Sequence, residues 1–240
     1  MDLFENSLSQ EIPPELGHLS RLKYLNLNKN LLGGEIPTNI SFCSNLIEID
    51  VRWNVLVGKN SVEFGSLSKL ELLFIHANNL TGGIPLTFGN LSSLQKFSAT
   101  PNSPMLLANW KISHILHSML NRLNFLSLTS IHLGSGRTGD LSFLQSLLNT
   151  TDLEIMALID NNFGGISLGF IGNFTWLRIF LVDGNRISGS ILNGIENLVN
   201  LERMELWESQ IIVVRIQIIR KHSILSWQSD EFNFAVFGTK

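Results

Sequence analysis

The sequence predicts an α/β solenoid, a right-handed superhelix with a parallel β-sheet along its concave side. Two observations predict it. The segments LKYLNLNKNLLGGEIP (22–37) and LELLFIHANNLTGGIP (70–85) share the template L-x-x-L-x-L-x-x-N-x-L-x-G-x-I-P. The template asparagine also recurs every 24 residues, at Asn6, Asn30, Asn54, Asn78 and Asn102. Self-similarity at such a period is typical of stacked repeats that bury one continuous core.

The L-x-x-L-x-L part of each repeat predicts a short strand with one buried side, because its last two leucines alternate in position. The residues between the leucines then line the concave side in columns, with neighbouring strands about 4.8 Å apart. One predicted column is Asn26, Asp50, Phe74, Ser98, Ser127, Ala157, Leu181 and Glu205. The next column is Asn28, Arg52, His76, Thr100, Thr129, Ile159, Asp183 and Trp207.

The recurring asparagines are predicted to be structural. Chain reversal after each strand leaves backbone groups pointing inward, and an amide offers both donors and an acceptor for them. The ladder resumes at Asn161 and Asn185, again 24 residues apart, while Ile131 and Ser209 occupy two other ladder positions. The second half of the template contains glycine and proline, which favour tight turns or extended chain over a long helix.

One stretch invites a different interpretation. Gly134, Gly136 and Gly139 follow G-x-G-x-x-G, with Asp160 further along, as in a dinucleotide-binding unit. A lone match is weak, and the repeat template continues on both sides of it. We therefore interpret the glycines as a turn in an extended repeat, followed by a true helix over 141–148 that Asp140 caps.

The repeats resemble the extracellular leucine-rich repeats of plant receptor-like proteins and receptor kinases. They look most like the group that includes the flagellin and bacterial elongation-factor receptors, over about residues 3–102 and 123–210. The resemblance implies recognition of a peptide or protein ligand on the concave face, with a co-receptor as a further partner. It also implies the extracellular side of the plasma membrane, and a chain that is a truncated piece of such an ectodomain.

Four parts are expected along the chain. Residues 1–102 and 123–210 hold repeats, the latter including the extended one, whereas 103–122 and 211–240 depart from the template. The apolar residues of 103–122 have helical spacing, which suits either an island that contacts a ligand or, as we favour, an altered repeat. The segment 211–240 suits either an improvised cap or a tail from an altered reading of the gene.

Composition and motifs argue against several other functions. The net charge of −3 gives no reason to expect nucleic acid as a partner. Kinase motifs are absent from the sequence, no cofactor or metal is expected, and His114 with His117 lacks a third ligand. The single cysteine, Cys43, stands at an apolar template position and is expected to be packed. The apolar run 211–225 contains charged residues, so no direct membrane insertion is expected.

Binding is the expected function, and the chain is not expected to be an enzyme. Aromatic side chains beside charges are typical of protein-binding faces. The ligand-binding candidates are Arg52, Trp53, Phe74, His76, Asp183 and Trp207. Sequons for N-glycosylation occur at Asn39, Asn79, Asn90, Asn149 and Asn173 and favour an origin in a secreted ectodomain, although MDLFENSLSQ is unlike a signal peptide. The alternative is a separate repeat protein that inhibits a foreign cell-wall hydrolase.

Overall fold

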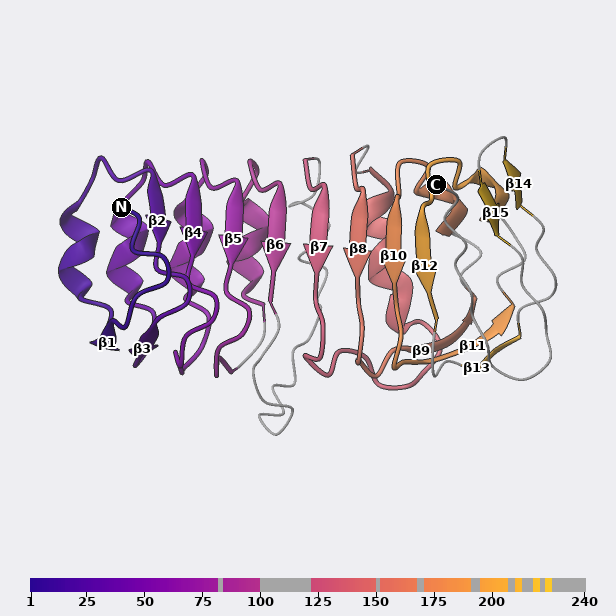
Figure 1. Cartoon of the computed structure of the whole chain (residues 1–240), viewed down its shortest axis with the longest axis horizontal. Coiled ribbons are helices and arrows are strands. Elements are labelled where there is room, and N and C mark those ends of the chain that lie inside the picture. Colours follow the sequence, from indigo (N-terminus) through magenta and orange to yellow (C-terminus); the bar gives the residue numbers. More distant parts are fainter. Residues whose placement is uncertain are drawn as a thin grey trace.

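The computed structural model describes residues 1–81, 84–99, 122–149, 152–167, 171–190, 195–206, 210–212, 218–220 and 223–225. Its main feature is an eight-stranded sheet, whose strands lie side by side along the long axis of the molecule (Figure 1). The strands, in chain order, are β2 (Tyr24–Asn26), β4 (Glu48–Asp50), β5 (Leu72–Phe74), β6 (Lys96–Ser98), β7 (Phe125–Ser127), β8 (Ile155–Ala157), β10 (Ile179–Leu181) and β12 (Arg203–Glu205). All neighbours pair in parallel, as the predicted α/β solenoid requires.

The core is a single apolar cluster that runs the length of the sheet. The middle residue of every strand is paired with the middle residue of the next strand and is buried. These residues are Leu25, Ile49, Leu73, Phe97, Leu126, Met156, Phe180 and Met204. The leucine alternation of the sequence therefore places one row of side chains in a shared interior.

Short 3₁₀ turns form the layer behind the sheet (Figure 1). They are η1 (Pro14–His18), η2 (Thr38–Phe42), η3 (Val62–Ser66), η4 (Leu86–Asn90), η5 (Asp140–Asn149), η6 (Ile171–Asn173) and η7 (Ile195–Asn197). Pro13, Pro37 and Pro85 precede η1, η2 and η4 with φ of −62°, −62° and −61°. Proline is restricted to this φ, so the return path begins with a fixed direction and stays short.

Smaller sheets follow the main strands. β1 (Ser9–Glu11) pairs in parallel with β3 (Leu31–Gly33), and β11 (Arg186–Ser190) lies between β9 (Gly164–Ser167) and β13 (Gln210–Ile212). β14 (Ile218–Arg220) and β15 (Ser223–Leu225) form an antiparallel pair. The predicted divergent segment 103–122, apart from Arg122, and most of 211–240 lie outside the described residues.

The asparagine ladder joins successive coils through their backbones. Asn54 is typical: its Oδ1 accepts from Leu32 N at 3.0 Å, and its Nδ2 donates to the carbonyls of Leu27 and Val51 at 3.0 Å each. The same pattern holds at Asn30, Asn78, Asn161 and Asn185, all of which are buried.

Two other predicted ladder positions, Asn6 and Asn102, are not among these buried rungs. Asn6 is exposed, and its side-chain amide donates only to the carbonyls of Leu3 and Phe4, so this amide does not join two coils as that of a buried rung does. Asn102 lies outside the described residues.

The glycine stretch is a turn within the solenoid. Gly134, Gly136 and Gly139 have φ of 86°, 73° and 96°, values that L side chains rarely adopt. β7 and β8, on either side of the stretch, are direct neighbours in the main sheet. The strands that would flank a nucleotide site therefore belong to the repeats.

The prediction for the helix after these glycines is partly wrong. The segment is a 3₁₀ helix, η5, rather than an α-helix. Asp140 was expected to cap it, but its Oδ2 accepts from the backbone N–H groups of Ser135, Arg137 and Gly164 at 2.8, 3.0 and 3.0 Å. The preceding loop curls back onto the carboxylate, which therefore ties this loop to the start of β9.

Candidate functional site

None of the described helices or strands covers the face of the main sheet opposite the 3₁₀ turns, and we call it the open face (Figure 1). Strand register brings the first predicted column together as expected. Its members are the last residues of the eight strands: Asn26, Asp50, Phe74, Ser98, Ser127, Ala157, Leu181 and Glu205. Thr100 and Trp207 of the second column lie outside the described residues.

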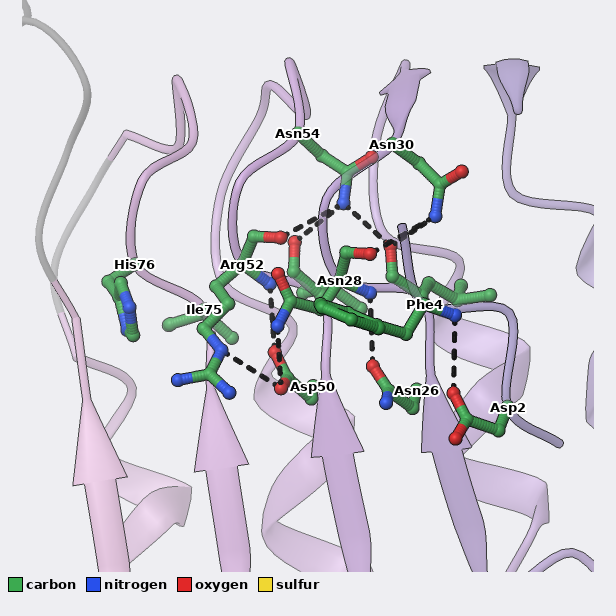
Figure 2. A network of polar contacts seen from close by, with 12 residues as sticks. Asp2, Phe4, Asn26, Asn28, Asn30, Asp50, Arg52, Asn54, Ile75 and His76 are labelled. Atoms are coloured by element: carbon green, nitrogen blue, oxygen red, sulfur yellow. Dashed lines mark hydrogen bonds and ion pairs between the residues drawn. The ribbon is translucent and has the colours of Figure 1, made fainter. Parts of the chain in front are cut away.

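Arg52 is the centre of the polar part of the open face (Figure 2). Its Nε lies 2.9 Å from Oδ2 of Asp50, whose side chain is 3% exposed. The contact is an ion pair rather than an aligned hydrogen bond. The guanidinium carbon also lies 5.0 Å from the ring centroid of Phe74, a distance typical of a cation–π contact. Arg52 is thus held by a buried carboxylate and an aromatic ring.

The Asp50 carboxylate is covered by its neighbours. Its Oδ1 accepts from Arg52 N at 3.2 Å, and its Oδ2 accepts from Asn28 Nδ2 at 3.4 Å. Burial raises the pKa of Asp50, while the charge of Arg52 acts in the opposite direction. Glu48 lies two residues earlier on β4, and its pKa is also raised, first by burial and then by the charge of Asp50.

His76 lies beside this pair and packs edge-on against Phe74, with ring centroids 6.3 Å apart. Burial, followed by the charge of Arg52, lowers the pKa of His76 to about 4. The ring is therefore neutral at pH 7. Its Nδ1 is buried and has no hydrogen-bond partner within the described part of the chain, and the same is true of Asn28 Oδ1. The sequence candidates Arg52, Phe74 and His76 thus form one cluster.

An apolar region adjoins this cluster, and sequence reasoning did not select it. Phe125 packs edge-on against Phe74 at 6.4 Å between ring centroids. Ile155 and Ile179 follow Phe125 in register on β8 and β10, and Leu181 ends β10. All of these side chains are only half-buried. Of these residues only Phe74 and Leu181 stand in the predicted columns, because Phe125, Ile155 and Ile179 are the first residues of their strands, a column that the two predicted ones do not include.

Two of the remaining sequence candidates, Trp53 and Asp183, lie elsewhere. Trp53 is 56% exposed and has φ of 54° in the turn after β4. Asp183 follows β10, so four strands of the main sheet separate it from β4. Trp207 lies outside the described residues. Trp53 and Asp183 are therefore not part of the Arg52 cluster.

Other predicted features are distributed over the rest of the molecule. Cys43 is fully buried, as expected of a packed thiol, and burial raises its pKa. Asn90 and Asn173 are exposed, whereas Asn39 and Asn79 are half-buried, and Asn149 ends η5. Within the described residues, no group of three or more histidine, cysteine or acidic side chains is placed to hold a metal. No helix in that part of the chain has the length and apolar character of a membrane span.

Comparison with known proteins agrees with this architecture. The family profile described as Leucine Rich Repeat matches residues 21–43 and 69–91. No curated protein matches the chain at a significant level. Among solved structures, an internalin of Listeria monocytogenes is 15% identical with a TM-score of 0.65, and the match covers 84% of this chain and 53% of that chain. At this identity the likeness shows the fold alone.

Two plant receptors are also similar. The Arabidopsis receptor kinase HAESA, solved with the peptide hormone IDA and the co-receptor SERK1, is 27% identical with a TM-score of 0.57. The match covers 88% of this chain and 30% of HAESA. The plant peptide hormone receptor RGFR1, solved with RGF2, is 18% identical with a TM-score of 0.51 over 89% of this chain and 43% of that chain. The chain thus spans less than half of either receptor. It carries leucine-rich repeats and folds as a leucine-rich-repeat solenoid, with plant receptor ectodomains among its structural neighbours.

Proposed function

We propose that this chain is the ligand-recognition region of a plant receptor-like serine/threonine kinase and that it binds a peptide or protein on its open face. The apolar region carries the proposal. Phe74, Phe125, Ile155, Ile179 and Leu181 leave apolar surface uncovered in adjoining positions. Contiguous exposed apolar surface with a polar rim is typical of protein-binding sites.

The dimensions suit an extended segment of a ligand. From β5 to β10 the sheet makes four steps of about 4.8 Å, which is about 19 Å in total. An extended peptide rises about 3.3 Å per residue, so about six residues would cross this distance. Two of the similar receptors were solved with peptide hormones, which supports a ligand of this kind.

The finer parts of the proposal rest on the sequence. The resemblance of the repeats favours the flagellin and elongation-factor receptor group, a role in defence signalling and a plasma-membrane location facing outward. Asn90 and Asn173 are the last residues of η4 and η6 and are exposed. Glycans at these residues would extend from the side opposite the open face and leave it free to bind (Figure 1).

The test is selection of binders from a phage-displayed library of random dodecapeptides. We expect wild-type protein to enrich a family of peptides and Ile179→Asp to reduce their affinity by about tenfold or more, because a charge would enter the apolar contact. Leu86→Asp is the matched control, since Leu86 is 69% exposed on η4, behind the sheet. Circular dichroism establishes that both variants fold. Equal loss in the two variants, or no loss with Ile179→Asp, would contradict binding on the open face.

A further inference from the structure

We propose that Arg52 binds a carboxylate of the ligand, so that the open face selects peptides with an acidic group over β4 and β5. This inference rests on the proposed function and names the chemistry that one part of the site recognises. It is carried by the way Arg52 is held, by the donors it leaves free and by the buried acceptors around it.

The guanidinium is fixed before any ligand arrives. Asp50 holds Nε at 2.9 Å, and the Phe74 ring lies 5.0 Å from the guanidinium carbon. Phe74 is itself wedged edge-on between His76 and Phe125. An arginine that is already positioned loses little conformational freedom on binding, so more of its interaction energy contributes to affinity.

The donors left over match a carboxylate. Nε is the nitrogen nearest Asp50, and neither terminal nitrogen of Arg52 donates a hydrogen bond to any of the described residues. The side chain remains 34% exposed. Paired terminal N–H groups form a planar fork, which fits the two oxygens of a carboxylate. A ligand cation would instead meet the positive charge of Arg52 directly.

Nearby acids do not cancel this preference. Asp50 is covered by its neighbours and already has Arg52 and Asn28 on its oxygens. Glu48 lies four residues before Arg52, about 13 Å along an extended chain. Coulomb energy falls with distance, so an anion in contact with Arg52 at about 3 Å is attracted more strongly than Glu48 repels it.

Two buried acceptors supply a second observation. Asn28 is 5% exposed, and its Oδ1 has no hydrogen-bond partner within the described part of the chain. His76 Nδ1 is in the same state beside Arg52, and the neutral ring accepts there when its proton is on Nε2. Unpaired buried acceptors are unfavourable. The backbone N–H groups of the ligand, next to its carboxylate, would donate to these two acceptors once the side chains of Asn28 and His76 turn toward the ligand.

The experiment uses the tightest peptide selected by the wild-type protein, synthesised with a fluorescent label. In one set, each aspartate or glutamate of the peptide is changed to its amide. In another, the terminal carboxylate is amidated, which separates a side-chain acid from the chain end. Fluorescence anisotropy measures the affinity of each peptide. We expect one of these changes to weaken binding to the wild-type protein about tenfold, and the same change to weaken binding to Arg52→Gln less than about twofold.

Three variants make the result interpretable. Arg178→Gln removes the charge of an exposed arginine that pairs with Glu154 and Glu202, and it should keep the full carboxylate effect. Arg52→Lys keeps the charge without the fork and should keep part of it. Asp50→Asn combined with Arg52→Gln avoids a buried unpaired charge and should behave as Arg52→Gln does.

The outcomes separate the two proposals. If the library yields no binder, the proposed function fails. If binders carry no carboxylate dependence, or if Arg52→Gln shows the same dependence as the wild type, the Arg52 inference is overturned while peptide binding stands.

Discussion

At the scale of single residues, an asparagine side-chain amide pairs with the inward-pointing backbone groups in successive coils. Asn78 accepts from Leu56 N at 3.1 Å and donates to the carbonyls of Val51 and Ile75 at 2.9 and 3.2 Å. A backbone turn that points polar groups inward requires such partners. Ile131 is buried at one ladder position and offers no amide there, so the extended repeat interrupts this chain of contacts.

His76 predicts an acid-sensitive stability. Its pKa is about 4 in the folded chain against 6.5 when unperturbed, so between these pH values the unfolded state binds more protons. Stability is therefore lost as pH falls from 6.5 toward 4. After allowance for solvent screening the effect is about 1–2 kcal/mol.

Urea denaturation of wild type and His76→Gln at pH 7.5 and 4.5 measures this effect, because the other titrating groups are common to both proteins. The wild type should lose more stability on acidification than the variant. NMR titration of the His76 ring gives an independent reading. A midpoint near 6.5 in the folded protein would rule out the burial that we assign to this ring.

At this scale, a feature can be predicted from the sequence when it follows from the repeat itself, and not when it depends on side chains from neighbouring strands. The ladder follows from periodicity, which identifies the five buried rungs Asn30, Asn54, Asn78, Asn161 and Asn185. The ion pair of Asp50 and Arg52 joins two residues that both appeared in the predicted columns. Its burial was not predictable, because it depends on Asn28 and Phe74 from neighbouring strands.

At the scale of elements, the 3₁₀ turns pack so closely that backbone meets backbone. A Cβ added at Gly65 in η3 would lie 2.2 Å from Thr87 O in η4. A Cβ added at Gly17 in η1 would clash with Asn39 O of η2 in the same way. At Gly17 and Gly65, contact between adjacent coils rather than turn conformation therefore requires glycine, whereas η2 has Ser41 at the same position.

We expect Gly65→Ala to lower the free energy of unfolding by about 2 kcal/mol or more, because a backbone carbonyl has to move. Gly33→Ala is the control: the nearest atom to its added Cβ is a side-chain carbon of Val55 at 3.9 Å. This variant should change stability by less than about 1 kcal/mol. Chemical denaturation compares the two, and equal effects would show that the coils can separate freely.

Element types were predictable from spacing, whereas loop details were not. Strands followed from leucine alternation, and short turns followed from proline. Wherever the structure describes it, the residue before a ladder position has a positive φ, as at Lys29, Trp53, Ala77 and Gly184 with 53°, 54°, 57° and 62°. No common residue type marks this position, so propensity alone could not locate it. Asp140 was misassigned because its partners come from the loop before it and from β9.

At the scale of the whole molecule, each coil contacts mainly its neighbours along one extended core. The order of strands in the main sheet follows the order of the repeats along the chain. This arrangement was predictable because identical units stack in sequence. The composition of the open face was not, because residues there do not determine the fold and can differ from coil to coil.

Nearest-neighbour stacking also predicts how damage spreads. Phe97 on β6 is buried and packs edge-on against Phe88 at 6.0 Å between ring centroids. Phe97→Ala should cost about 3–5 kcal/mol through a core cavity. In a solenoid the loss should be concentrated in the adjoining coils, since distant coils share no contacts with the cavity.

Hydrogen exchange followed by mass spectrometry can test this locality. We expect Phe97→Ala to increase exchange in peptides covering β5 and β7 while those covering β10 and β12 stay protected. Phe180→Ala, at the matching core position of β10, should give the opposite distribution. A uniform rise along the chain in both variants would mean that the coils unfold together. Ligand binding on one part of the open face could then alter the stability of every repeat, whereas local unfolding would confine that effect to the strands in contact.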